Sequence, residues 1–276
     1  MAAVADDALK DGVPKYADAL RAFHEGFRAE LEALVAALPL AAGMRVLDMA
    51  CGDGFYTELL RACVGPTGLV VGLDNSLPYL CEAEDGPTLR KPYICGALEC
   101  MPFERESFDF VWCAQSLYSL PDPVRALELL RPMLRRGGLI GVLENDSMHE
   151  VLMPWPVSLE LAVRAAERQA MCMESAKPNK YYVGRELSSV LARAGFEPVG
   201  LRTQVIDRAT PLGAAEEFFV QNYIVRLLDR VGDRLDDHHR QMLQSLGDEQ
   251  SPQYLLGRRH VTISWMNILA IARRND

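Results

Sequence analysis

The segment VLDMACGDGFYT, residues 46–57, decides the fold of this chain. Its apolar beginning is typical of a buried strand, and a helical pattern starts near Phe55. Between them stand Gly52 and Gly54, which permit positive φ and let a ligand approach the backbone where a Cβ would obstruct it. The segment therefore predicts a strand, a glycine turn that can hold a ligand, and a helix.

Short apolar runs and helical patterns alternate on both sides of this turn. We predict helices at residues 56–63, 77–84, 123–134 and 185–194, the last ending at Gly195. We predict strands at residues 45–49, 69–73, 93–95, 108–113, 139–143, 199–206 and 261–271. This alternation predicts an α/β fold with a mostly parallel, seven-stranded sheet that helices cover on both faces.

Three segments stand outside the alternation. An amphipathic helix is predicted over residues 16–38, within an N-terminal helical segment of residues 13–40. Residues 145–182 and 211–257 are too long for connecting loops and carry helical patterns of their own. Ligands of open α/β sheets bind at the carboxyl ends of the strands, so these two insertions are predicted to form a helical cap there. We expect one domain, residues 1–276.

The chain has 276 residues, and 49% of them are hydrophobic, enough for a sizeable core. Its 29 Lys and Arg residues against 38 Asp and Glu residues give a net charge of −9. An acidic protein gains little from phosphate contacts, so nucleic acid and anionic membranes are not expected partners.

Seven cysteines, an odd number without CxxC or CxH pairs, predict reduced thiols and no zinc site. The pair His238-His239, in a segment rich in charges, is expected on a solvated surface, and we predict no metal. There is no signal-peptide pattern at the N-terminus and no apolar run approaching the roughly 18–20 residues of a membrane helix. We therefore expect a cytoplasmic protein without a membrane partner.

Two cofactor interpretations compete at the glycine turn. A dinucleotide fingerprint requires a glycine three residues after Gly54, where Thr57 stands. An S-adenosylmethionine pocket requires no pyrophosphate contact, and the carboxylate of Asp48 suits a ligand that is cationic and bears an amine. Asp74 ends the second predicted strand, where a carboxylate can hold a ribose under either interpretation. Its alternative role is to cap the helix that follows Asn75.

Four segments, in order and correctly spaced, resemble class I S-adenosylmethionine-dependent methyltransferases, of the branch that includes the ubiquinone and menaquinone biosynthesis methyltransferases. The resemblance covers residues 43–144 and implies a Rossmann-like class I methyltransferase fold with S-adenosyl-L-methionine as cofactor. Its segments are VLDMACGDG (46–54), GLDNS (72–76), GALECMPFERESFDFVWC (96–113) and LPDPVRALELLRPMLRRGGLIGVLE (120–144).

The resemblance also implies roles for individual residues. Asp48 and the glycine turn would line the methionine end of the cofactor, Asp74 would hold the ribose, and Gln115 would face the methionine portion and the acceptor. Ala97 stands where the family often has an Asp that accepts from the adenine amine, although the backbone N–H of the next residue is still present. The implied cofactor-binding residues are Asp48, Gly52, Gly54, Asp74, Asn75, Leu77, Ala97, Leu98 and Gln115.

Methyl transfer is an in-line displacement that depends mainly on proximity and alignment. A general base assists when the acceptor is a hydroxyl or an acidic carbon. His149, which follows the fifth predicted strand, is our first candidate, and for every candidate a surface or packing role is the alternative. The predicted catalytic residues are His149, Tyr118 and Tyr182, with Tyr16, His24 and Tyr181 as further candidates.

We predict biosynthetic methyl transfer to a small organic acceptor through oxygen, nitrogen or carbon. The alternative is a non-catalytic S-adenosylmethionine-binding or scaffold protein with the same fold. A nucleic-acid methyltransferase is disfavoured because the Asn/Asp-Pro-Pro-aromatic motif is replaced by Gln-Ser-Leu-Tyr at residues 115–118. Whether the cap promotes a homodimer is left open.

Overall fold

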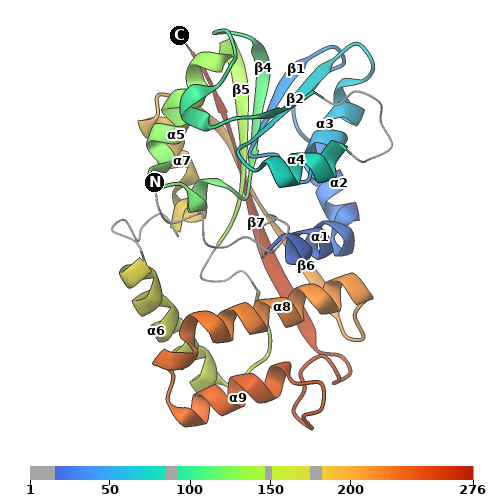
Figure 1. The fold of residues 1–276 in the computed structure, drawn as a ribbon, viewed down its shortest axis with the longest axis vertical. Helices are drawn as coiled ribbons and strands as arrows, with labels where there is room; N and C mark the ends of the chain where they lie inside the picture. The colour runs from blue at the N-terminus through green and yellow to red at the C-terminus, as the bar shows by residue number, and fades with distance from the viewer. Residues whose placement is uncertain (1–15, 85–91, 147–150, 175–181, 276) are drawn as a thin grey trace.

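The computed structural model describes residues 16–84, 92–146, 151–174 and 182–275. Its centre is a seven-stranded sheet in the order β3-β2-β1-β4-β5-β7-β6 (Figure 1). The five strands β1 to β5 run parallel, and β7 is antiparallel to both of its neighbours. The strands are β1 (Arg45–Met49), β2 (Leu69–Asp74), β3 (Tyr93–Cys95), β4 (Phe108–Ala114), β5 (Leu134–Asn145), β6 (Glu197–Ala209) and β7 (Thr262–Arg273).

The mostly parallel seven-stranded sheet confirms the predicted fold class. The strand order reverses between β1 and β4, and in such sheets the ligand binds beyond the carboxyl ends of the strands at this point. The helices are α1 (Ala17–Gly26), α2 (Arg28–Ala36), α3 (Phe55–Val64), α4 (Leu77–Glu84), α5 (Pro123–Leu130), α6 (Val157–Glu174), α7 (Val183–Arg193), α8 (Ala214–Val231) and α9 (Asp237–Gly247).

Alternation of side chains along the central strands divides the core between the two faces of the sheet. On β4, Phe110 and Trp112 join the cluster that contains Leu31 of α2 and Leu60 of α3. Their neighbours Val111 and Cys113 join the opposite cluster, which contains buried leucines of α5 and α7. The glycine turn that follows β1 is therefore supported by packed layers on both sides.

Two predicted helices were wrong in extent. The helix predicted over residues 16–38 is two helices, α1 and α2, which are separated at Phe27. Gly26 is a poor helix former, and α8 lies so close that a Cβ at this position would be 2.8 Å from a side-chain carbon of Glu216. The helix predicted over 123–134 ends at Leu130, because Pro132 cannot donate to the helical ladder, and a short 3-10 turn leads into β5.

The antiparallel strand pair β6–β7 extends past the carboxyl ends of the other strands. β5 pairs with β7 only between Asn267 and Arg273, whereas β6 pairs with β7 from Thr262 onward. The two predicted insertions carry α6, α8 and α9. Figure 1 shows these helices gathered around the protruding end of the β6–β7 pair. These helices therefore lie on the side of the sheet where the glycine turn opens.

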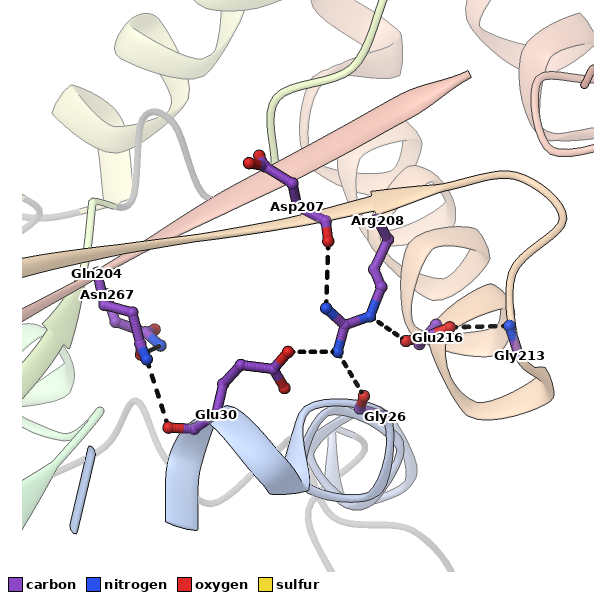
Figure 2. Close-up of polar contacts among 8 residues, drawn as sticks. All are labelled: Gly26, Glu30, Gln204, Asp207, Arg208, Gly213, Glu216 and Asn267. Carbon is purple, nitrogen blue, oxygen red and sulfur yellow. Dashed lines mark hydrogen bonds and ion pairs between the residues drawn. The ribbon is translucent and has the colours of Figure 1, made fainter. Parts of the chain in front are cut away.

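Arg208 of β6 ties the N-terminal helices to α8 (Figure 2). Its guanidinium contacts Glu30 of α2 at 2.8 Å, forms an ion pair with Glu216 of α8, and donates to the backbone carbonyl of Gly26 at 3.3 Å. The Arg208 guanidinium also lies over the ring of Phe27, 5.3 Å from its centroid. One side chain thus holds α1, α2 and the cap together.

Within the ranges given above, no helix combines the length and the apolar character that crossing a membrane would require.

Candidate functional site

The glycine turn connects β1 to α3 and has the geometry that its sequence predicts. Gly52 and Gly54 both adopt left-handed backbone conformations, with φ of 54° and 78°. No other atom lies within 4 Å of where a Cβ of Gly52 would stand, so the backbone here is open to a ligand. The N-terminus of α3 follows directly, and although the N–H of Phe55 donates to Asp53 at 3.1 Å, the positive end of the helix dipole favours negatively charged or hydrogen-bond-accepting ligand groups here.

Asp74, at the carboxyl end of β2, lies against this turn. One of its carboxylate oxygens accepts the N–H of Gly52 at 2.9 Å, and the other accepts the N–H of Ser76 at 2.8 Å. The second bond closes a turn just before α4, which begins at Leu77, so Asp74 holds both the glycine turn and the turn that leads into this helix, and its role as a helix cap stays a prediction. Burial raises the pKa of Asp74. A carboxylate has about four acceptor sites, which leaves capacity for ribose hydroxyls.

Asp48 lies beneath the turn and is only 1% exposed. It accepts the hydroxyl of Thr57 at 2.6 Å, which fastens the first turn of α3 to β1. Burial raises the pKa of Asp48 to about 7, against the opposing effect of the Thr57 hydrogen bond, and the charges of Asp74 and Asp53 raise it further. A cationic ligand near this carboxyl group would favour its ionised form.

The residues predicted for the adenine side of the cofactor lie next to Asp74. The N–H of Gly96 donates to the backbone carbonyl of Asp74 at 2.9 Å, which places Ala97 and Leu98 beside the end of β2. Ala97 precedes a short 3-10 helix that begins at Leu98. Leu77, in the first turn of α4, is 59% exposed and thus available to cover a flat ring. Asn75 lies between these residues, in the turn that joins β2 to α4.

Gln115 follows β4 in a left-handed conformation, with φ of 50°. Its N–H donates to the carbonyl of Leu143 at 2.7 Å, and its side-chain amide lies 3.5 Å from the side-chain oxygen of Asn145. These contacts join the carboxyl ends of β4 and β5, at the edge where the glycine turn also lies.

Glu144 is a residue of this edge whose role the sequence analysis missed. It is fully buried and accepts the backbone N–H groups of Ser116 at 3.0 Å and Leu117 at 2.6 Å. Burial raises its pKa to about 8, although these hydrogen bonds lower it. Glu144 therefore fixes the loop that carries Gln115 and Tyr118. The signal available in the sequence was a lone acidic residue ending an apolar strand.

The three predicted catalytic residues have different outcomes. His149, like the further candidate Tyr181, lies outside the described residues. Tyr118 is 40% exposed on the 3-10 turn Leu117–Ser119. Tyr182 directly precedes α7 at its N-cap position, and α7 contacts that turn. The guanidinium of Arg185 lies 5.1 Å from the centre of the Tyr182 ring. Tyr118 and Tyr182 are therefore on adjoining elements, while the position of His149 stays a prediction.

The sequence analysis also missed Asp53, which meets the further candidate His24 at the turn itself. Nδ1 of His24 lies 3.4 Å from a carboxylate oxygen of Asp53, and the imidazole stacks on the ring of Phe55 with centroids 4.1 Å apart. Burial alone would raise the pKa of Asp53, but the hydrogen bond and charge of His24 lower it below its ordinary value. Asp53 stands between the two glycines, so the turn motif held no separate signal for a role of its side chain.

Among the residues that the structure describes, no group of three or more His, Cys, Asp or Glu side chains is arranged to hold a metal ion. His238 and His239 lie on α9, where Nδ1 of His239 contacts Asp236 at 2.8 Å.

Comparison with known proteins places these features in context. The sequence profile of a methyltransferase domain matches residues 47–142. A demethylmenaquinone methyltransferase from Oceanobacillus iheyensis is 28% identical over 59% of this chain and 73% of its own length. A second, from Staphylococcus aureus, is 35% identical over 38% of this chain, and the match spans 44% of that relative, less than half its length.

Two solved structures share the fold. A Bacillus halodurans methyltransferase structure superposes with a TM-score of 0.54 at 18% identity, covering 90% of this chain and 98% of the other. A Haloferax volcanii methyltransferase, solved with a methyltransferase activator, gives a TM-score of 0.54 at 17% identity, with coverage of 96% and 100%. At these identities the similarity establishes the fold alone.

Proposed function

We propose that this chain, which carries an S-adenosylmethionine-dependent methyltransferase domain in a class I fold, transfers a methyl group to a small organic acceptor. The match of a methyltransferase domain to residues 47–142 supports the family resemblance and the predicted cofactor. The acceptor, the residues that contact it and the residues that bind the cofactor are proposals, argued below from the described contacts.

One observation carries the proposal: Asp74 and Gly52 are joined by a 2.9 Å hydrogen bond at the strand-order reversal. This bond brings the carboxylate that would hold a ribose next to the open backbone that would receive the methionine end. S-adenosylmethionine supplies a methyl group already activated by a sulfonium, so the protein has to align the acceptor and exclude water. The helices α6, α8 and α9 lie around the protruding end of the β6–β7 pair, at the edge of the sheet where they could cover an acceptor (Figure 1).

The finer proposal concerns the acceptor. The relatives from O. iheyensis and S. aureus are named for a demethylmenaquinone acceptor, an aromatic ring system when reduced. We infer a ring-bearing acceptor of this general kind for the present chain. Tyr118 and Tyr182, on adjoining elements at the carboxyl edge, are the proposed aromatic contacts. His149 is retained as a proposed acceptor-side residue on its sequence position alone.

Isothermal titration of the purified chain with S-adenosylmethionine and S-adenosylhomocysteine tests the cofactor assignment. We expect micromolar binding of both ligands and no binding of NADH. Asp74→Ala should weaken binding at least about tenfold, the scale of a lost hydrogen bond to a charged group. Asp237→Ala is the matched control, because the Asp237 side chain is 91% exposed on α9. A folded wild-type chain that binds neither adenosyl ligand would overturn the proposal.

Turnover separates the enzyme from the non-catalytic alternative. The chain is incubated with S-adenosylmethionine and a panel of dithionite-reduced 1,4-naphthoquinone, simple phenols and amines, and formation of S-adenosylhomocysteine is measured. We expect product with the reduced naphthoquinone. Tight cofactor binding without product from any member of the panel would favour a non-catalytic S-adenosylmethionine-binding protein.

A further inference from the structure

A buried histidine lies beside the glycine turn and is not used by the proposed function. His24 of α1 is 5% exposed, and its Nδ1 faces Asp53 at 3.4 Å. Its other ring nitrogen, Nε2, is buried and has no hydrogen-bond partner among the described residues. An unsatisfied buried polar atom costs about 1–3 kcal/mol, so a position of this kind calls for a partner that binds there.

Two other polar atoms near His24 are also buried without a hydrogen-bond partner among the described residues. The His24 ring meets the ring of Tyr56 edge-on at 5.4 Å, and Tyr56 meets Trp112 of β4 at 5.6 Å. The Tyr56 hydroxyl and the Trp112 indole N–H are also buried without a partner in the described part of the chain. Trp112 is paired in register with Asp48 on β1, so this row of rings begins at α1 and ends at the cofactor-side strand.

The Asp53 contact determines which nitrogen of His24 can accept a proton. The pKa of Asp53 is lowered, so its carboxylate is ionised at neutral pH and can only accept hydrogen bonds. Nδ1 of a neutral His24 must then carry the hydrogen, which leaves the lone pair on Nε2. A carboxylate that orients an imidazole in this way also stabilises the imidazolium that forms when Nε2 takes up a proton.

We propose that His24, oriented by Asp53, is the proton acceptor for the methyl acceptor, an inference that rests on the proposed function. As the acceptor's nucleophilic oxygen or carbon forms its bond to the methyl carbon, the methyl–sulfur bond breaks and its electron pair stays on sulfur. The acceptor's proton moves to Nε2 of His24 and then leaves to solvent. Acceptor and S-adenosylmethionine thus give methylated acceptor, S-adenosylhomocysteine and one proton.

Charged and titratable groups face this pair from several elements. The guanidinium of Arg28, on α2, lies 5.1 Å from the Phe55 ring on which His24 stacks, and Arg21 of α1 acts on Asp53. Tyr56 and Asp48 lie on the sheet side, and burial keeps the pKa of the Tyr56 hydroxyl above its ordinary value. The Tyr56 hydroxyl is therefore neutral at neutral pH and does not serve as the base of this cluster.

The first test measures the imidazole of His24 directly in the wild-type chain of residues 1–276. Nitrogen-15 NMR of labelled histidine, with His24→Asn to assign the signal, reports which ring nitrogen carries hydrogen at pH 7 and pH 8. The proposal requires hydrogen on Nδ1 and a lone pair on Nε2 at pH 8. Hydrogen on Nε2 in the neutral ring would overturn it. Asp53→Asn should shift this tautomer balance, because the amide can also donate.

The second test is kinetic and uses reduced 1,4-naphthoquinone as the probe. His24→Asn retains an N–H donor for Asp53 but lacks the second nitrogen, and His238→Asn is the control on the exposed face of α9. General-base catalysis contributes about 100- to 10,000-fold, so kcat at pH 8 should fall at least about 100-fold in His24→Asn. Affinity for S-adenosylhomocysteine should change less than threefold.

The outcomes separate the two proposals. A wild-type chain that binds no S-adenosylhomocysteine refutes the proposed function. Intact binding with wild-type kcat in His24→Asn refutes only the role of His24. Should His24→Asn fail to fold, Asp53→Asn takes its place in the kinetic test with a smaller expected loss, about tenfold, and the NMR test on the wild-type chain still decides.

Discussion

Replacing Asp48 by Asn should change how the stability of the chain depends on pH. The carboxyl group has a pKa of about 7 in the folded state against an ordinary value of 3.8, because it is buried between β1 and α3. A raised acid pKa means that the folded state holds the proton more tightly than the unfolded state. Stability from this group is therefore complete below about pH 4 and declines as pH rises toward 7.

The size of the effect follows from the two pKa values. Each unit of difference corresponds to about 1.4 kcal/mol, so full ionisation of Asp48 costs about 4 kcal/mol. Between pH 5 and pH 8 the contribution of Asp48 to the unfolding free energy should fall by about 2–3 kcal/mol, because part of the full loss has already occurred at pH 5, where Asp48 is ionised in the unfolded chain. Asn cannot ionise, and its side-chain oxygen can still accept the Thr57 hydroxyl, so the variant should lack this decline.

Urea unfolding at both pH values, followed by circular dichroism, measures the effect in the ligand-free protein. The difference in unfolding free energy between Asp48→Asn and wild type should move by about 2–3 kcal/mol in favour of the variant from pH 5 to pH 8. Glu144 titrates in both proteins, so its contribution cancels from the difference. Asp237→Asn, on an exposed side chain, should show no such change. An equal difference at both pH values would refute the reasoning.

Three further changes test packing. Gly72→Ala should lower the unfolding free energy by about 1–3 kcal/mol, because a Cβ there would lie 2.5 Å from a ring carbon of Tyr93 on β3. The control Gly232→Ala places its Cβ in open space on a helical backbone and should be neutral or stabilising by up to about 1 kcal/mol. Thermal melts compare the two variants. Leu31→Ala should cost about 2–5 kcal/mol because the side chain is fully buried, while Leu161→Ala, 67% exposed, should cost under about 0.5, and denaturant midpoints distinguish them. Arg208→Met should lower stability by about 1–3 kcal/mol through loss of both glutamate contacts, and limited proteolysis should then cut α1 and α2 sooner; an unchanged cleavage pattern would contradict the tie drawn in Figure 2.

Local patterns made much of the central fold predictable. The strand at 45–49 was predicted with its observed bounds, because a buried parallel strand followed by turn residues is a strong local signal. The short edge strand at 93–95 was also predicted with its observed bounds, although it is only partly buried. The glycine turn was predictable from a local signal too, since its two left-handed glycines, Gly52 and Gly54, lie only two residues apart in the chain. Pro132 ended a helix earlier than its apolar periodicity suggested, which shows that one missing N–H outweighs several favourable side chains.

The sequence alone determined the alternating strands and helices, the glycine turn, and the carboxylate that ends β2. Only the tertiary structure decided which distant groups meet: His24 with Asp53, 29 residues apart, and Arg208 with the carbonyl of Gly26, 182 residues apart. It also decided that α1 ends at Gly26, where α8 approaches. Periodicity specifies which face of an element is buried, whereas the partners on that face depend on how the elements pack against one another.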